Sequence, residues 1–211
     1  MDEHRWDSLW IALGAKAPQG SFDELVSLYT EPHRRYHNVS HILAALNHFD
    51  SLKGLARRPE LVEFSLWLHD AVYDPRATDN EAQSADLAER YLVAVGLGHL
   101  IAEVRRLIMA TAHTSPSEAD DAGLVVDIDL SVLALHPAGY AEYTRAVRQE
   151  YQWVPDVLFQ AGRSKLLQSF LAMPQLYSHP TNIAAWEDTA RKNIKSELRS
   201  LTPASCVDVA P

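Results

Sequence analysis

Cysteine is almost absent from this chain, since Cys206 is the only one among its 211 residues. A single cysteine excludes a framework of internal disulfides and is typical of a reducing compartment. Long apolar runs are absent too, because none approaches the ~20 residues that a membrane-spanning helix needs. The acidic start, Met1 to Asp7, is unlike a signal peptide. We therefore expect a cytoplasmic protein with no membrane partner.

Positive charge is also scarce. Lysine and arginine number 19 against 28 aspartates and glutamates, which gives a formal net charge of −9. This balance argues against nucleic-acid polymers as partners, because they attract extended basic surfaces. A small phosphorylated molecule stays compatible with it, since the field of a bound cation can outweigh the global charge.

Strand-like alternation is hard to find, and helical periodicity dominates. The length suits one domain with a substantial core. We predict a single all-α domain over 1–201 and a disordered tail over 202–211. Ser21 and Glu24 suggest a capping box, and the ambiguous run 124–135 is assigned to helix because no second strand is available to pair with it. The expected helices cover about 21–30, 39–49, 59–72, 80–96, 99–112, 124–135, 137–152, 155–172 and 183–201.

Two short motifs carry most of the chemical information. The first runs from Tyr36 to His41 with the sequence Tyr-His-Asn-Val-Ser-His, and the second is the dyad His69-Asp70 at the end of the apolar run 64–68. Buried polar groups need partners, so a dyad in that position has little packing purpose of its own. With Asp129, these motifs supply imidazoles and carboxylates, a donor set that suits a borderline or hard divalent cation.

The order of these motifs resembles the HD-domain superfamily of metal-dependent phosphohydrolases, which are all-helical. The Tyr-His-Asn-x-x-His motif is similar to the opening motif of the cyclic nucleotide phosphodiesterases, and Asp129-Leu130-Ser131 is similar to their closing motif. The stretch 36–193 resembles a bacterial subfamily of predicted HD phosphohydrolases. The resemblance implies a helical bundle of the HD type.

The same resemblance implies a role for each residue of the motifs. It makes His41, His69, Asp70 and Asp129 the ligands of one divalent metal ion, which can be Mn, Co, Ni, Fe, Zn or Mg. It makes His37 the proton donor to the leaving oxygen. A loop histidine can titrate near neutrality, whereas one on a helix is held rigidly enough to ligate. Asp70 can also orient the attacking water.

Two assignments stay open at the level of sequence. His33, His37 and His41 are four residues apart, so a continuous helix would place them on one face and allow His37 and His41 to exchange roles. Asp127 competes with Asp129, because residues two apart on a helix diverge and only one can face the metal. Asp127 would then support a ligand or cap a helix.

Three further residues are candidates for binding substrate. His113, at a helix end, lies where some HD proteins carry an extra histidine that binds a second metal or the substrate, or it simply complements the helix dipole. Glu81, close to the dyad through a short turn, can reach the pocket or simply stabilise a helix N-terminus. Arg163 can hold a phosphate or lie on a solvated face. Tyr177, Glu187 and Arg191 also fall where the subfamily has residues of those types, without an assigned role.

The function that the sequence predicts is hydrolysis of a small phosphate ester or nucleotide, with His37 as acid and Asp70 beside the attacking water. Two alternatives stay open. Some HD proteins with two iron ions are oxygenases, and a non-catalytic regulator that binds a metal or ligand would use the same residues.

Overall fold

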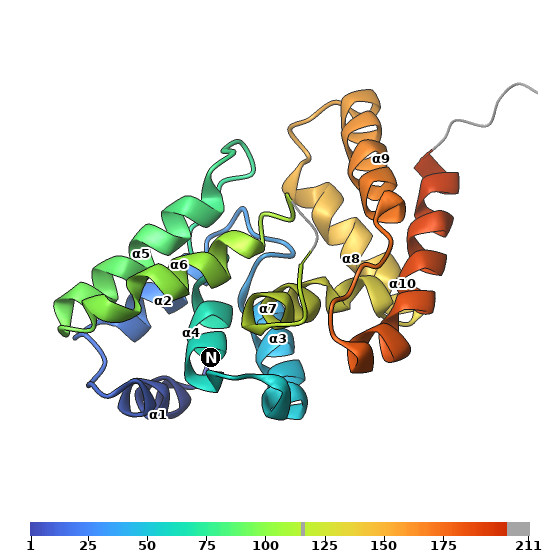
Figure 1. Cartoon of the computed structure of the whole chain (residues 1–211). Helices are drawn as coiled ribbons and strands as arrows, with labels where there is room; N and C mark the ends of the chain where they lie inside the picture. The colour runs from blue at the N-terminus through green and yellow to red at the C-terminus, as the bar shows by residue number, and fades with distance from the viewer. Residues whose placement is uncertain (115–116, 202–211) are drawn as a thin grey trace, which may run out of the picture.

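The computed structural model describes residues 1–114 and 117–201, which form ten α-helices, three short 3-10 helices and no strand. The all-α prediction is confirmed. The predicted tail, 202–211, lies outside the described residues. Figure 1 shows the arrangement of the α-helices. They are α1 (Glu3–Leu13), α2 (Ser21–Tyr29), α3 (Val39–Leu52), α4 (Pro59–Leu68), α5 (Asn80–Ala94), α6 (Ile101–Ala110), α7 (Asp121–Asp129), α8 (Pro137–Glu150), α9 (Asp156–Ala172) and α10 (Pro180–Leu201), with η1 (Lys53–Leu55), η2 (Gly98–Leu100) and η3 (Leu130–Ala134).

The N-terminal region departs from the sequence-based expectation in two ways. Helix α1 was not predicted, although Asp2 caps it by accepting a hydrogen bond from the His4 backbone N–H. The predicted capping box at Ser21 is wrong. Gly20 occupies the N-cap of α2, and the Ser21 hydroxyl instead accepts a hydrogen bond from the Trp6 indole at 3.0 Å. The buried indole therefore takes the acceptor that a capping box would need.

Two helix boundaries determine where the motif residues lie. Helix α4 ends at Leu68 rather than near Val72, so the chain turns as it reaches the His69-Asp70 dyad. The ambiguous run 124–135 is helical as predicted. It begins earlier, at Asp121, because the Asp120 side chain accepts a hydrogen bond from the Gly123 backbone N–H at 3.0 Å. Helix α7 ends at Asp129, and the 3-10 helix η3 follows directly from Leu130.

The buried apolar side chains form two clusters that meet at α7. The first is built from helices α1 to α7 and includes the fully buried Trp6, Trp10 and Trp67. The second is built from α7, η3, α8, α9, α10 and the segment before α10. Figure 1 shows α1, α2, α5 and α6 on one side of the molecule, α8, α9 and α10 on the other, and α3, α4 and α7 between them. Asp129, at the end of α7, therefore lies where the two clusters adjoin.

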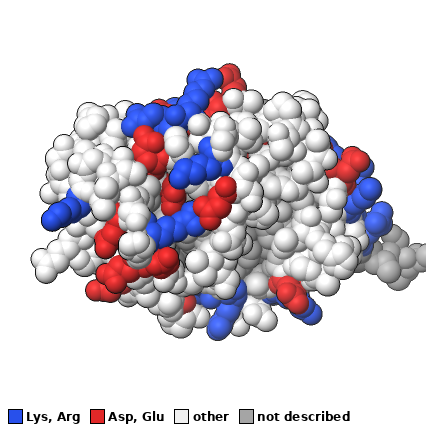
Figure 2. All heavy atoms as spheres, turned by 90° about the horizontal axis from the view of Figure 1, so that it is seen from below, with Lys and Arg blue, Asp and Glu red and all other residues white. Residues whose placement is uncertain are grey.

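Charges of both signs are interspersed on the surface. On the face that Figure 2 shows, lysine and arginine side chains alternate with acidic ones and form no extended basic track. Arg5, for example, forms ion pairs with Asp50 at 2.8 Å and Glu63 at 2.7 Å. Within the described residues, no single helix combines the length and the apolar character needed to cross a bilayer. One pair of segments, 121–134 and 137–150, satisfies those criteria jointly but is bent by 105°.

Candidate metal centre

Three elements bring the four predicted ligands to one point. His41 lies in the first turn of α3, which starts where the Asn38 side chain accepts a hydrogen bond from the Ser40 backbone N–H. His69 and Asp70 follow the last residue of α4, and Asp129 is the last residue of α7. One ligand atom from each of these four residues lies within 4.8 Å of the others. Helix ends rather than helix faces therefore supply three of the four groups.

The distances between these atoms suit a shared cation. The Nε2 atoms of His41 and His69 are 3.1 Å apart. Asp70 Oδ2 lies 3.2 Å from the first and 3.1 Å from the second, and Asp129 Oδ1 lies 3.4 and 3.5 Å from them. Donor atoms that share a cation at about 2.1 Å are separated by about 3.0 to 3.4 Å in octahedral or tetrahedral geometry. The four residues therefore fit a single metal ion.

A hydrogen bond on the far side of the ring from the cluster fixes the orientation of His69. Its Nδ1 is 3.1 Å from the carbonyl oxygen of Leu66, so Nδ1 carries the proton and donates it to that carbonyl. In the neutral ring, Nε2 then presents a lone pair toward His41. Both rings are buried, and two lone pairs 3.1 Å apart repel each other unless a proton or a cation lies between them.

The charges of the cluster lead to the same conclusion. Burial favours the neutral carboxyls, yet the nearby histidines hold the pKa of Asp70 and of Asp129 well below the usual range. Burial also opposes protonation of His41 and His69, but hydrogen bonds and charge from the two aspartates raise the pKa of both rings. The two carboxylates thus create a buried position that favours positive charge.

His37 lies beside this cluster and contributes no ligand atom to it. The residue precedes α3, and its ring centroid is 6.1 Å from that of His41. Its Nδ1 is 2.7 Å from Glu150 Oε2. The continuous helix through residues 33–41 is not formed, and His33 instead bonds through Nε2 to the Tyr73 carbonyl at 2.8 Å. This geometry supports His41, not His37, as the ligand.

Sequence reasoning missed Glu150, which positions His37. One of its oxygens accepts hydrogen bonds from the backbone N–H groups of Arg35, Tyr36 and His37, and the other is bonded to the His37 ring and the Tyr73 hydroxyl. Burial opposes ionisation, but these bonds lower the pKa of Glu150 to about 2. No sequence signal marks the partnership, since 113 residues separate Glu150 from His37.

Arg34 is a second residue that the motifs did not indicate. Its buried guanidinium donates hydrogen bonds to the carbonyl oxygens of His37, Asp70 and Ala71 at 3.0, 2.7 and 2.8 Å, and it pairs with Glu31. It therefore joins the loop that carries His37 to the turn that carries Asp70. This link fixes His37 relative to the ligand cluster.

The competition between Asp127 and Asp129 is settled by their surroundings. Asp127 is fully buried and accepts hydrogen bonds from the backbone N–H groups of Ser178 and His179 and from the Asn182 side chain. It fastens the segment that leads into α10, and the Asn182 side chain on α10, to α7. Asp129 faces the cluster through Oδ1, while its Oδ2 lies 3.0 Å from His113 Nε2. His113 is thus brought to the centre through Asp129.

The other two predicted substrate contacts, Arg163 and Glu81, and the residues without an assigned role contribute no atom to the ligand cluster. Arg163 is buried in an ion pair with Glu197 at 2.8 Å and bonds to the Tyr143 hydroxyl at 3.1 Å. Glu81 lies half-buried in the first turn of α5 and shares no hydrogen bond with the cluster in the described part of the chain. Arg191 pairs with Glu187 and donates to carbonyls of the 171–174 segment. The Tyr177 hydroxyl donates to the Leu130 carbonyl.

No protein-family model matches the chain, and no curated protein or solved structure matches it either. The chain holds a buried cluster of two histidines and two aspartates that can bind a metal ion, with a histidine-glutamate pair directly beside it.

Proposed function

We propose that the chain is a metal-dependent phosphohydrolase of the HD type that acts on a small phosphate ester. One observation carries the proposal: the four-residue ligand cluster lies next to a histidine that takes no part in ligation and is held by a buried carboxylate. The ordered motifs that resemble the HD superfamily support it. The acidic net charge of −9 favours a small phosphorylated substrate, such as a nucleotide, over a polymer.

His41, His69, Asp70 and Asp129 would hold the cation. A bound divalent cation lowers the pKa of water and neutralises phosphoryl oxygens. Asp70 directs Oδ2 at the histidines, which leaves Oδ1 to accept a hydrogen bond from the attacking water. As the water oxygen bonds to phosphorus and the ester P–O bond breaks, the water would pass a proton to Asp70 Oδ1 and His37 would donate one to the leaving oxygen. Glu150 holds the imidazole through Nδ1, so Nε2 is the atom that delivers this proton.

The number of ligand groups favours hydrolysis over di-iron oxygenation. Among the residues that the structure describes, one group of histidine, cysteine, aspartate and glutamate side chains has the spacing to hold a metal ion, and it has four members. A pair of iron ions needs more protein ligands than these, as the carboxylate-rich di-iron sites of helical bundles illustrate. The single-metal interpretation therefore fits the donor set better.

A reconstitution experiment tests the proposal. Protein stripped with chelator and reloaded with Mn²⁺, Co²⁺, Ni²⁺, Fe²⁺, Zn²⁺ or Mg²⁺ is screened for phosphate release from a broad set of nucleotides and phosphomonoesters. We expect metal-dependent release by the wild type and by the exposed control Asp7→Asn, and none by Asp129→Asn. Metal bound by the wild type without release from any ester would contradict hydrolysis and favour a regulator. Activity confined to oxidation with iron and dioxygen would favour the oxygenase.

A further inference from the structure

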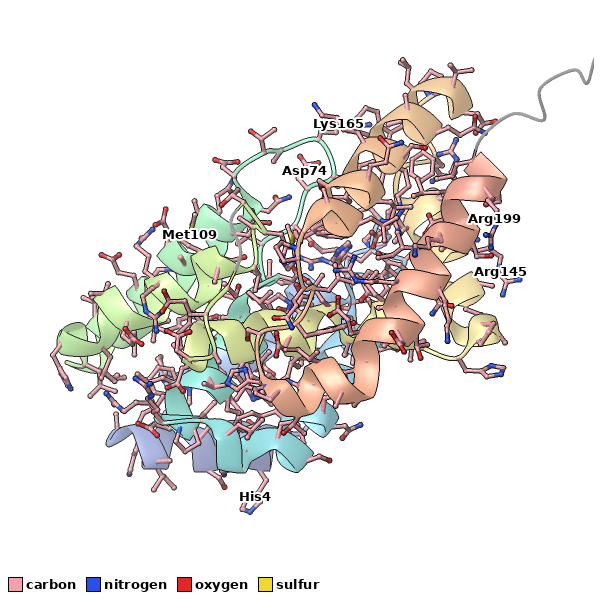
Figure 3. All side chains as sticks on the ribbon, turned by 45° about the vertical axis from the view of Figure 1, so that its right-hand side comes forward. His4, Asp74, Met109, Arg145, Lys165 and Arg199 are labelled. Atoms are coloured by element: carbon pink, nitrogen blue, oxygen red, sulfur yellow. The ribbon has the colours of Figure 1, made fainter. Side chains whose placement is uncertain are left out.

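A small cavity adjoins the metal centre on the side of the C-terminal helices. It has a volume of about 180 Å³ and lies between α7, the end of α9 and the connection that leads into α10. Figures 1 and 3 show this connection passing close to α7, and the bonds from Ser178 and His179 to Asp127 hold it there. Apolar side chains form most of the wall, namely Val126, Leu130, Phe170, Met173, Leu176 and Tyr177.

His113 connects the cavity to the ligand cluster. On one side its Nε2 is 3.0 Å from Asp129 Oδ2, and on the other its ring lines the cavity and meets the Phe170 ring edge to face at 5.9 Å between centroids. Its backbone adopts φ 52°, a left-handed conformation that is unfavourable for a residue other than glycine. Such strain persists where the surroundings hold a side chain in place. One imidazole therefore separates the cavity from a metal ligand.

The cavity has no cationic lining among its described residues. Its polar members besides His113 are Ser117, Gln175 and Ser178. The nearby Arg191 is committed to Glu187 and to backbone carbonyls of the cavity wall. Figure 3 places Arg145 and Arg199 on the outer side of the C-terminal helices and Lys165 on the side of α9 toward Asp74. A second phosphate or a carboxylate would find no lysine or arginine counter-charge here, and a sugar would place most of its hydroxyls against apolar wall.

We propose that this cavity binds the uncharged part of the substrate, and that this part is a single planar ring close to the scissile phosphate. This inference rests on the proposed function, which places the phosphate of the substrate at the metal centre. Pockets for drug-sized ligands measure roughly 300–1,000 Å³, so about 180 Å³ suits one ring better than a larger polycyclic group. The preferred substrates are thus phosphomonoesters of a one-ring aromatic or heteroaromatic alcohol, rather than sugar phosphates or bisphosphates.

The methionines provide a direct probe of binding that needs no turnover. The chain has three, Met1, Met109 and Met173, and Met173 alone among them lines the cavity. Met109 is 39% exposed on α6 and is labelled in Figure 3. The protein is labelled with methyl-¹³C methionine, and the NMR signal that is absent from the Met173→Leu variant is assigned to Met173. The metal-loaded wild type is then titrated with phenylphosphonate, which cannot be hydrolysed as an ester, and with methylphosphonate, which has the same anionic group without the ring.

We expect phenylphosphonate to shift the Met173 signal saturably, to leave the Met109 signal in place and to bind about tenfold or more tightly than methylphosphonate, because ring burial adds affinity. Phenol should shift the same signal in metal-free protein. Gln175 is an exposed residue of the cavity lining, and Gln175→Lys should place a positive charge there. The variant should therefore bind a phosphonate with a second anionic group more tightly, so that its preference for phenylphosphonate becomes smaller. The control Gln149→Lys, at an exposed position of α8, should leave this preference unchanged.

An unshifted Met173 signal at saturating phenylphosphonate, or equal affinity for the two phosphonates, would overturn the cavity assignment even if the protein hydrolyses phosphate esters. A Met173 shift in a protein that releases no phosphate would support the cavity and contradict the proposed reaction. The two hypotheses are therefore tested separately.

Discussion

His37 and His41 are four residues apart, yet only His41 contributes a ligand atom to the cluster. The difference follows from the helix start at Val39, because His41 lies on the first turn of α3 whereas His37 lies before it and turns toward Glu150. Asn38 accepts a hydrogen bond from the Ser40 backbone N–H and so fixes the boundary between the two roles. A capping residue thus separates the candidate ligand from the proposed acid.

Replacing each histidine in turn tests these roles. His41→Ala should lose the metal, since one of four donor atoms is removed. His37→Ala should keep its metal and lose turnover by roughly 10²–10⁴-fold, the usual contribution of a general acid. Elemental analysis and phosphate-release rates provide the two readouts. The opposite pattern, with metal lost only in His37→Ala, would establish the exchanged assignment of the two residues.

Glu150 gives a prediction about pH. Its pKa is about 2 in the folded chain and 4.5 in its ordinary state. Because the folded-state pKa is depressed, the stabilisation is complete above pH 4.5 and is lost as the pH falls from there toward 2. The difference corresponds to about 3 kcal/mol in the free energy of unfolding. Glu150→Gln should therefore be less stable at pH 6 and show a flatter stability profile below pH 4.5.

Denaturant unfolding at several pH values measures this effect. Glu142→Gln, an exposed change on the same helix α8, is the matched control and should follow the wild-type curve. Parallel pH profiles for the wild type and Glu150→Gln would show that the carboxylate does not carry this stabilisation.

At the scale of the elements, helix type was predictable and helix ends were less so. Apolar periodicity identified nine of the α-helices, but α4 ends at Leu68 and α7 begins at Asp121. Helix α1 was overlooked although Trp6, Leu9, Trp10 and Leu13 have helical spacing and are buried. Hydrogen bonds from distant residues, such as the one from Trp6 to Ser21, decide these details, and local periodicity contains no information about them.

Two glycines, Gly123 in α7 and Gly162 in α9, test how closely other segments pack against these helices. A Cβ at Gly123 would lie 1.9 Å from the Glu118 carbonyl oxygen and 2.4 Å from the Ser178 hydroxyl, whereas a Cβ at Gly162 would meet nothing within 4 Å. Gly123→Ala should therefore destabilise the protein by more than about 1 kcal/mol, since backbone must move. Gly162→Ala should stabilise it by about 0.5–1 kcal/mol, because alanine is the better helix former. Thermal unfolding compares the two, and equal effects would contradict the close approach at α7.

At the scale of the whole molecule, the sequence indicated the four candidate ligands but not the residues that position them. His41, His69, Asp70 and Asp129 belong to short local motifs, which a single sequence can reveal. Glu150, Arg34 and the cavity at Met173 arise only when segments far apart in the chain meet, so no spacing rule could identify them. Arg163 illustrates the converse, because a cation next to a glycine resembled a phosphate contact and the fold commits it to Glu197.

The candidate metal centre also joins the two halves of the molecule. His41, His69 and Asp70 come from helices of the first apolar cluster, while Asp129 ends the helix that both clusters share. A ligand that binds only the native state stabilises it, by about 2.7 kcal/mol at a free concentration 100 times its Kd. For a chain of this length, that corresponds to a rise in Tm of roughly 5–10 °C.

Removal of the metal should therefore lower the Tm of the wild type, and readdition should restore it. Asp129→Asn should unfold at the same temperature with and without metal, because the buried oxygen charge that completes the cluster is gone. The exposed control Asp7→Asn should respond to metal as the wild type does. A wild-type Tm that is independent of metal, measured by differential scanning calorimetry after chelation and reloading, would mean that the four side chains do not hold a metal ion in the folded protein.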